Sequence, residues 1–557
     1  MPPAHQVKAL CESININPYL ATILVQRGIL NFEDAHNFFR PSLNQLHDPF
    51  LMKDMDRAVG RLKKAIDKEE KILIYGDYDV DGTTAVALVY SYIKGFYPHC
   101  DYYIPDRAKE GYGVSTDGIL WAEENGFSLI IALDLGIKSA DMVLMANRKG
   151  IDFIICDHHL PGQAIPQAIA VLDPKRPDCP YPYKELSGCG LGFKLLQAFA
   201  LRHKPDTTPN GYLDLVAVSI ASDIVPIHGE NRILAYCGLK KLNENPLPGL
   251  KALKDLAGIR TDLDISGVVF TLGPRINAAG RMGHAHAAVE LLIAETEQEA
   301  MALAEKINLK NDLRREVDLN ITEEALAMIR ADDRLQNSKS TVLFKETWHK
   351  GVIGIVASRC VEKYYRPTVI LTQSNDMLTG SARSVKDFDL YEALSQCGHL
   401  LEKFGGHKYA AGLSLSKDKL ADFQKLFEEV VSRTITEEML IPLVEIDVAL
   451  PFDAITPKFR AVLKQMAPFG PENHKPVFES GKVFVANSLS SFKDKHIRFL
   501  AGQQGSGSLV NVVGFDLMAY YQQLASGDTF RIAYTIEENT YNGNTTLQLR
   551  LKDIKFE

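Results

Sequence analysis

Apolar segments of strand length alternate with amphipathic segments of helix length along residues 71–175. The strand candidates are 71–76, 101–105, 128–133, 151–156 and 168–172, and the helix candidates between them are 83–94, 115–125 and 138–149. Strands that alternate with helices of this length predict a parallel sheet. Ligands of such sheets bind in the crevice outside the carboxyl ends of the strands. The residues that follow each strand candidate are therefore the first place to look for a site.

Three acidic residues directly follow the first strand candidate. Asp77, Asp79 and Asp81 alternate in the turn 77–82, and a helix-favouring stretch begins at Thr83. Three carboxylates crowded together repel one another unless a hard cation lies between them. A solvated acidic turn in which one Asp caps the helix is the alternative interpretation of this motif taken alone.

Acids and imidazoles also follow the neighbouring strand candidates. They are Asp134, the triplet Asp157-His158-His159, Asp173, and Asp223 at the end of the helix candidate 213–220. Any one of them could be a cap or a surface side chain, but their repetition at several strand ends indicates a metal site. Carboxylate and imidazole ligands suit Mn²⁺, Mg²⁺ or Zn²⁺, and two such ions bridged by a carboxylate hydrolyse phosphodiesters. Asp173 precedes Pro174 and is expected to form a turn instead.

The rest of the chain divides into segments of different pattern. We predict an N-terminal helical segment over 1–60, a catalytic α/β domain over 61–283, a helical connector over 284–335, a second α/β domain over 336–437, and an all-β barrel or sandwich over 438–557. Short alternating runs separated by turn clusters such as 502–508 are typical of the all-β class.

Composition excludes several classes of function. The net charge of −8 lacks the basic signature of a nucleic-acid-binding protein, so any polyanion needs a local basic groove. The eight cysteines include no CxxC pair, which argues against a zinc ribbon and favours buried thiols in a reducing compartment. No apolar stretch reaches the ~18 residues of a membrane span, and the N-terminus lacks a signal pattern, so we expect a cytoplasmic protein that binds no membrane.

The triplet Asp157-His158-His159, placed after the acidic turn, resembles the signature of the DHH phosphoesterase superfamily. Longer segments resemble one bacterial branch of it, the single-strand-specific exonucleases. These segments are 110–115, 273–281, 348–359, 380–384, 404–412 and 467–473. The resemblance covers about residues 20 to 557 and implies a DHH domain, a DHH-associated domain and a C-terminal oligonucleotide-binding (OB) barrel.

The resemblance also implies a two-ion site occupied by Mn²⁺ or Mg²⁺. Asp79 and Asp134 would hold one ion, with Asp77 nearby. Asp81, His158 and Asp223 would hold the other together with Asp134, which becomes the bridge. The remaining members of the triplet are expected to act beside the ions: His159 on the scissile phosphate or as an orienting group, and Asp157 by fixing the histidine tautomers.

A second set of residues is implied to hold the end of the nucleic acid. It comprises Arg275, Asn277, Arg281, Ser381, Arg383, Gly405, Gly406 and His407. Arg275 is our first choice for a 5′-phosphate pocket with Ser381 and Arg383, although Asn277 and Arg281 could equally be helix caps. Gly405-Gly406-His407 is expected to form a turn that lets the backbone approach a ligand closely.

Two further features stay open between a binding and a structural role. Trp348 could stack on a base or belong to the core. The basic stretch with Lys493, Lys495, His496 and Arg498 could contact nucleic acid or be a solvated face.

The resemblance implies a 5′→3′ exonuclease that acts on single-stranded DNA in repair and recombination and releases 5′-mononucleotides by two-metal hydrolysis. One alternative is a DHH phosphodiesterase of small nucleotides or short oligonucleotides, which would need neither the β domain nor the connector. The other is a catalytically silent nucleic-acid-binding relative, which would have lost metal ligands. Partnership with single-strand-binding protein and a helicase is a further implication, and we expect a monomer.

Overall fold

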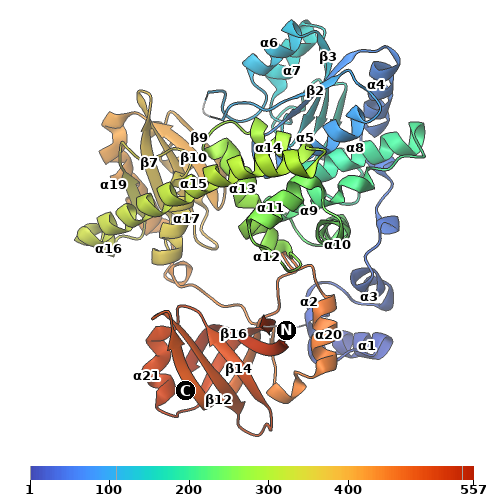
Figure 1. Ribbon diagram of the computed structural model, residues 1–557. Helices are drawn as coiled ribbons and strands as arrows, with labels where there is room; N and C mark the ends of the chain where they lie inside the picture. The colour runs from blue at the N-terminus through green and yellow to red at the C-terminus, as the bar shows by residue number, and fades with distance from the viewer. Residues whose placement is uncertain (1, 108, 542–543, 557) are drawn as a thin grey trace. The chain divides into compact units, whose positions relative to one another are not determined.

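The computed structural model describes residues 2–107, 109–541 and 544–556 (Figure 1). The chain forms two compact units. The first comprises residues 1–273, 289–300 and 444–557, and the second comprises 274–288 and 301–443.

A five-stranded parallel sheet forms the centre of the first unit, as the alternating pattern predicts. Its order is β2-β1-β3-β4-β5. The strands are β1 (Lys71–Gly76), β2 (Cys100–Tyr103), β3 (Phe127–Leu133), β4 (Asp152–Cys156) and β5 (Ala170–Leu172). Helices cover both faces of a sheet of this kind, which explains why residues 72–76 of β1 are all buried.

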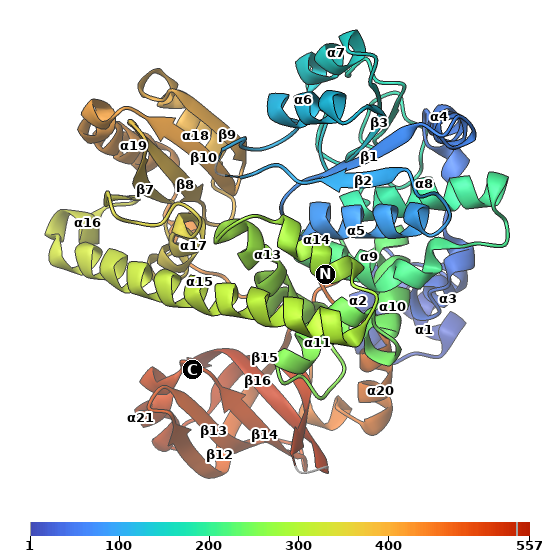
Figure 2. The same ribbon diagram turned by 45° about the horizontal axis from the view of Figure 1, so that its top comes forward.

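Helices lie on the two faces of this sheet (Figure 2). On one face lie α4 (Met55–Asp67), α5 (Val80–Lys94) and α8 (Gly188–His203), and beyond them lie α9 (Leu213–Ser222), α10 (Gly229–Glu244) and α11 (Pro248–Leu256). On the opposite face lie α6 (Thr116–Glu124) and α7 (Ala140–Arg148). Leu73 and Tyr75 of β1 pack on the α6 side, in one core with Ile119 and Val143. Alternate residues of the strand thus pack against the helices on opposite faces of the sheet.

The C-terminal segment is a closed barrel, which decides between the two predicted all-β forms. It comprises β12 (Phe478–Phe492), β13 (His496–Gln503), β14 (Leu509–Gly514), β15 (Phe530–Tyr541) and β16 (Asn544–Phe556). The strands follow the order β12-β13-β14-β16-β15, and pairing of β12 with β15 closes the ring. The strand β11 (Val448–Ala449) and the helices α20 (Pro457–Gln465) and α21 (Tyr521–Ala525) accompany it.

The N-terminal helices share a hydrophobic core with this barrel. They are α1 (Ala4–Ile14), α2 (Pro18–Gln26) and α3 (Phe32–Phe39). Leu20 and Leu24 of α2 belong to the same buried cluster as Phe459, Phe478 and Phe530 of the C-terminal segment. The two ends of the chain therefore fold together.

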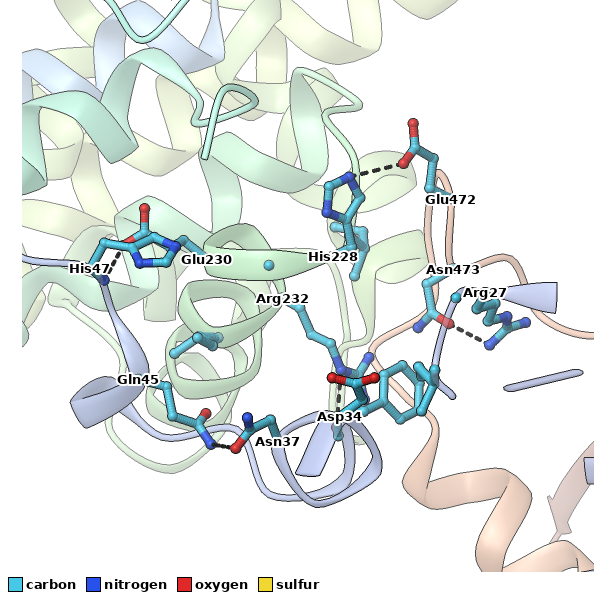
Figure 3. Close-up of a pocket in the computed structure, with 16 residues that line it drawn as sticks. Arg27, Asp34, Asn37, Gln45, His47, His228, Glu230, Arg232, Glu472 and Asn473 are labelled. Carbon is cyan, nitrogen blue, oxygen red and sulfur yellow. Dashed lines mark hydrogen bonds and ion pairs between the residues drawn. The ribbon is translucent and has the colours of Figure 1, made fainter. Parts of the chain in front are cut away.

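A set of buried polar contacts joins these elements to the sheet domain (Figure 3). Arg232 of α10 is 4% exposed, stacks on Phe38 with 3.8 Å to the ring centroid, and donates to the carbonyl oxygens of Phe38, Met466, Ala467 and Pro468. Arg27 donates to Oδ1 of Asn473 beside a cavity of about 370 Å³. The segment 467–473 thus acts as a structural joint within the first unit.

Helices follow one another through residues 265–337. They are α12 (Ile265–Gly267), a π-helix (Val268–Leu272), α13 (Gly273–Arg281), α14 (His286–Ile293), α15 (Glu297–Ala331) and α16 (Asp333–Asn337). α15 has 35 residues and makes up most of the segment 284–335, which the sequence predicts to be helical.

A mixed sheet of order β6-β7-β8-β10-β9 lies in the second unit. Its strands are β6 (Thr341–Phe344), β7 (Thr368–Ser374), β8 (Met377–Arg383), β9 (Lys403–His407) and β10 (Ala410–Leu415), and its helices are α17 (Ile353–Tyr364), α18 (Leu390–Gln396) and α19 (Leu420–Thr434). Only β6 and β7 are parallel.

The prediction of a turn at Gly405-Gly406-His407 is wrong, because these residues end the edge strand β9. They pair with Gly412, Ala411 and Ala410 of β10, and the turn falls at Lys408-Tyr409. A Cβ atom on Gly406 would collide with the carbonyl oxygen of Ala410, and φ is +148° there. The glycine is needed for close pairing of two strands and not for a turn.

Candidate two-metal centre

The acidic turn after β1 is compact and largely buried. Asp79 is the N-cap of α5, and its Oδ1 accepts a 3.1 Å hydrogen bond from the backbone N of Gly82. This capping agrees with the alternative interpretation of the motif. Asp77 and Asp81, however, are only 2% and 1% exposed, so the turn is not a solvated acidic surface.

Asp134 follows β3 and has an uncommon backbone conformation. Its φ is +62°, and its side chain is buried. Left-handed conformations of non-glycine residues cost about 1–3 kcal/mol and cluster at functional sites. The start of α8 packs directly on this residue, because a Cβ atom on Gly188 would lie 2.6 Å from Asp134 Cβ.

His158 lies among three carboxylates. Its Nε2 is 3.1 Å from Asp134 Oδ1, 3.5 Å from Asp223 Oδ2 and 3.8 Å from Asp81 Oδ2. Asp223 reaches this point as the C-cap of α9.

The ligand atoms form three overlapping groups, each with its atoms within 4.8 Å of one another. The groups are Asp77-Asp79-Asp134, Asp81-His158-Asp223 and Asp134-His158-His159. Asp134 is shared between the acids of the turn and the histidines, and this is the position that a bridging ligand requires.

Burial and mutual repulsion oppose ionisation of these acids. Burial raises the pKa of Asp77, Asp134 and Asp223 well above the usual range, and neighbouring carboxylates raise it further. Burial and Asp81 likewise raise the pKa of Asp79. Asp77 Oδ1 and Asp134 Oδ1 are buried and accept no hydrogen bond from the described residues, although His158 Nε2 lies 3.1 Å from Asp134 Oδ1. A divalent cation would relieve the repulsion between the carboxylates and would give these oxygens a partner, so the donor set fits a metal.

Burial favours the neutral form of His158, which is the form that a metal ligand needs. Burial lowers its pKa, although Asp81 acts in the opposite direction. Metal binding requires neutral imidazole, and burial therefore prepares this side chain for coordination.

Asp81 is held by the N-terminus of α8. Its Oδ2 accepts a 2.7 Å bond from Gly188 N, and its Oδ1 accepts bonds from Cys189 N at 2.8 Å and Ser219 Oγ at 2.7 Å. A helix N-terminus stabilises negative charge through its free N–H groups and its dipole. Gly188 and Ser219 contact this candidate metal ligand, and the sequence interpretation missed them because both lie more than 100 positions from Asp81.

Asp157 orients His159 and not His158. Its Oδ1 accepts a 2.7 Å hydrogen bond from His159 Nδ1, and its Oδ2 accepts a 2.9 Å bond from the backbone N of Ile137. Burial acts to lower the pKa of His159, but the bond to Asp157 outweighs it and the pKa is raised. The Tyr112 hydroxyl lies 3.1 Å from His159 Nε2. His159 is thus a half-buried, readily protonated side chain beside the acids.

Asp173 forms the predicted turn, because its Oδ1 accepts a 2.7 Å bond from Lys175 N two residues later. It is also fully buried, and burial raises its pKa to about 7.

Ser381 and Arg383 lie together in the second unit, below the first turn of α17. Arg383 Nη1 donates to Ser381 Oγ at 3.0 Å. A Cβ atom on Gly354 of α17 would lie 2.9 Å from Ser381 Oγ and 3.0 Å from Arg383 Nη2. The N-terminal end of a helix and a guanidinium therefore meet at one point, and this combination suits a phosphate.

The two candidate arginines of α13 differ in position. Arg281 donates to the carbonyl oxygen of Gly351 at 3.0 Å, two residues before α17 begins. Arg275 donates instead to Oδ1 of Asn308 on α15 at 3.0 Å. Asn277 lies inside α13 and does not cap it. Arg281 is therefore the arginine of α13 that lies next to the start of α17.

The strand register places His407 on the same face of the sheet as Arg383. His407 pairs with Ala410, and Ala410 pairs with Arg383, while Gly405 reaches Ser381 through Gly412. Cross-strand partners point to one face. The small residue Ala410 therefore lies between the His407 imidazole and the Arg383 guanidinium on this face of the sheet.

Trp348 has the core role, since it is 4% exposed and its Nε1 donates to Glu324 Oε2 at 2.8 Å. The basic stretch of the barrel lies at the turn between β12 and β13. From this stretch, Arg498 lines a groove of about 620 Å³ together with Ser490, Phe492 and Gln548.

Comparison with known proteins identifies the family. Family models match residues 71–220 as the DHH family, N-terminal domain, residues 337–433 as the DHHA1 domain, and residues 446–553 as the RecJ OB domain. The single-stranded-DNA-specific exonuclease RecJ of Bacillus subtilis is 37% identical over 99% of this chain and 70% of its own length. The chain belongs to the RecJ family. The Haemophilus influenzae RecJ is 32% identical over 97% of this chain and 96% of its own length.

Solved RecJ structures share the fold. RecJ of Thermus thermophilus in complex with Mn²⁺ matches all of this chain and 78% of its own, with a TM-score of 0.85 and 26% identity. An exonuclease RecJ bound to manganese matches 71% of this chain and 97% of its own, with a TM-score of 0.61 and 31% identity. The predicted fold class, with DHH, DHH-associated and OB parts, is confirmed. No helix in the described part of the chain has the length and apolarity needed to cross a membrane.

Proposed function

We propose that this RecJ-family chain is a 5′→3′ exonuclease that hydrolyses single-stranded DNA with two divalent metal ions and releases 5′-mononucleotides. RecJ relatives named as single-stranded-DNA-specific exonucleases support the substrate. The observation that carries the chemistry is the shared position of Asp134 between two groups of ligand atoms. Action in DNA repair and recombination follows from the family.

The two ions would be Mn²⁺ or Mg²⁺, as in the solved RecJ complexes. Asp77, Asp79 and Asp134 would hold one of them, and Asp81, Asp134, His158 and Asp223 the other. When bound, the ions would lower the pKa of a coordinated water molecule. They would also neutralise the negative charge that develops on the phosphate in the transition state.

His159 would contact the scissile phosphate directly, and Asp157 would act on it only by orienting His159. The 2.7 Å bond from His159 Nδ1 to Asp157 directs Nε2 away from that carboxylate. The raised pKa of His159 favours an N–H donor at Nε2, and a charged donor of this kind binds a phosphate oxygen strongly. Asp157 is thus the positioning residue and His159 the catalytic one.

The 5′-phosphate pocket would be formed by Arg281, Ser381 and Arg383, with His407 on the same face of the sheet. The proposal replaces Arg275 by Arg281 as the first choice, because Arg281 and not Arg275 bonds to the segment that opens α17. Gly405 and Gly406 would contribute exposed backbone of β9, and Asn277 would act only through α13. Recognition of a terminal phosphate would direct cleavage to the 5′ end.

We expect a cytoplasmic monomer that works with single-strand-binding protein and a helicase. The barrel groove with Arg498 would contact the strand beyond its end, so binding should weaken as salt rises.

A side-by-side digestion tests the function. The substrates are 5′-phosphorylated single strand, blunt duplex and dinucleotide, each with Mn²⁺ and with EDTA. We expect Mn²⁺-dependent mononucleotides from the single strand and little product from the duplex. A clear preference for the dinucleotide would favour the small-nucleotide phosphodiesterase, and absence of any metal-dependent product would favour the silent relative.

A further inference from the structure

The hydroxyl of Tyr112 lies beside His159 at the metal centre. Its oxygen is 3.1 Å from His159 Nε2 and 3.4 Å from Nδ1, and the two rings meet edge to face with 5.9 Å between their centroids. Nδ1 already bonds to Asp157 Oδ1 at 2.7 Å, so the hydroxyl lies along the remaining edge of the imidazole. Neither the proposed metal ligands nor the proposed 5′-phosphate pocket includes Tyr112.

The electrostatic surroundings of this hydroxyl show that it lies close to the acids. Burial raises the pKa of the Tyr112 hydroxyl, and the carboxylates of Asp134, Asp77 and Asp157 raise it further. Tyrosine with its proton is a hydrogen-bond donor. The residue as a whole is nevertheless 57% exposed. A donor therefore reaches the centre from a side chain that a ligand can still approach.

Tyr112 lies in a short segment that is fixed at both ends. Glu110 Oε2 accepts a hydrogen bond from Ser115 Oγ, which ties the two ends of the segment together. Between them, Gly111 and Gly113 flank Tyr112 with φ of +84° and +93°. The space where Gly111 would carry a Cβ atom is open to 4 Å. The backbone beside Tyr112 thus has room for a small adjustment when a ligand arrives.

An oxygen of the scissile phosphate that bonds to His159 would lie next to this hydroxyl. In the proposed function His159 Nε2 donates to such an oxygen, at a distance of about 2.8 Å. The Tyr112 oxygen is already 3.1 Å from the same nitrogen. Two oxygens that contact one nitrogen are close neighbours, so a small movement of Tyr112 brings its O–H to the phosphate oxygen.

We propose that Tyr112 is a further catalytic residue, whose hydroxyl donates a hydrogen bond to the same non-bridging oxygen of the scissile phosphate as His159. The inference rests on the proposed function, in which that oxygen contacts His159. Negative charge grows on the non-bridging oxygens as water attacks phosphorus, and donors that are already in place stabilise this charge. Tyr112 shares its proton and does not transfer it.

Replacement of Tyr112 by phenylalanine removes the donor and keeps the ring. We expect kcat for Mn²⁺-dependent digestion of 5′-phosphorylated single strand to fall about tenfold while KM stays nearly unchanged, because a contact made mainly in the transition state acts on kcat. Tyr236→Phe is the matched control, since it removes a hydroxyl from a residue of α10 that is 44% exposed. It should leave kcat unchanged. Urea unfolding measures whether the two variants are equally stable.

The same substitution in a His159→Gln background separates direct from indirect action. If Tyr112 contacts the phosphate, Tyr112→Phe should still lower the single-turnover rate by about threefold or more in this background. If Tyr112 only orients the imidazole, its replacement has no further effect once the imidazole is absent.

The inference is overturned if Tyr112→Phe digests single strand with the wild-type kcat, if its effect is confined to KM, or if the effect disappears in the His159→Gln background. The wild-type digestion judges the proposed function separately. Absence of a Mn²⁺-dependent product from wild type overturns both proposals, whereas normal wild-type digestion together with one of these three results overturns the role of Tyr112 alone.

Discussion

The carboxylate of Asp81 and the backbone N of Gly188 are joined by a 2.7 Å hydrogen bond at the start of α8. The same glycine packs against Asp134. The absence of a side chain at Gly188 therefore lets the start of α8 lie close to two candidate metal ligands. Cys189 N and Ser219 Oγ complete the set of donors on Asp81. Orientation of this carboxylate is thereby fixed before any ion binds.

Replacement of Gly188 by alanine should damage catalysis more than folding. The new Cβ would lie 2.6 Å from Asp134 Cβ, and relief of that clash would move α8 away from Asp81. We expect an activity loss of about 10–100-fold, as for the loss of groups that orient metal ligands. Steady-state digestion of single strand measures it. Gly162→Ala is the control, since its nearest neighbour would be at 4.0 Å, and equal activity of the two variants would contradict the role.

Removal of Asp134 should separate catalysis from binding. Asp134→Ala is expected to lower turnover on the order of 10³-fold or more, because a bridging ligand serves both ions. Single-strand binding in EDTA should stay largely intact. Loss of one buried carboxylate should raise the Tm in EDTA, whereas Mn²⁺ should raise the Tm of wild type more than that of the variant. Near-wild-type turnover would show that the bridging assignment is wrong.

Arg281 and Arg275 form a matched pair for the 5′-phosphate pocket. Arg281→Gln should reduce the preference for 5′-phosphorylated over 5′-hydroxyl single strand about tenfold in kcat/KM, the effect of one charge-assisted contact. Arg275→Gln should leave the preference unchanged, because Arg275 bonds to Asn308. The reverse pattern would restore Arg275 as the phosphate ligand.

Asp173 should make stability depend on pH. Burial raises its pKa to about 7 in the folded protein, against ~3.9 for an unperturbed Asp. The folded state therefore binds this proton more tightly, and its contribution to stability is lost as pH rises through about 7. Asp173→Asn should gain on the order of 1–3 kcal/mol over wild type at pH 8 and almost nothing near pH 4. Urea unfolding in EDTA measures both values, with the exposed Asp206→Asn as control; an equal gain at both pH values would refute this origin.

Arg232 should be essential for the joint within the first unit. Arg232→Ala leaves the carbonyl oxygens of Phe38, Met466, Ala467 and Pro468 without this donor in a buried place. We expect a loss of about 3–5 kcal/mol in the free energy of unfolding, measured by urea denaturation. Arg57→Ala, whose side chain is 59% exposed, should cost less than about 1 kcal/mol. Similar losses in the two variants would count against the joint.

Local pattern was enough to predict the strands β1 to β5 and the residues that follow them. The strands β1, β3 and β4 are buried almost throughout and are each followed by an Asp, so their ends are visible in the amino-acid order alone. The metal-ligand candidates Asp77, Asp134 and His158 came from the same reasoning, because parallel strands bring their carboxyl ends to one edge.

Tertiary structure decided what depends on partners distant in sequence. The pair Gly405-Gly406 predicts a turn by composition, yet pairing with β10 makes it part of a strand. The amino-acid order alone does not distinguish Arg275 from Arg281. The folded chain does, because Arg275 bonds to Asn308 of α15 and Arg281 bonds to Gly351. The donors to Asp81 lie 107 and 138 positions away in the chain. Periodicity reports which face of an element is buried, but a hydrogen bond between distant segments depends on how those faces pack, and that is settled only in the folded chain.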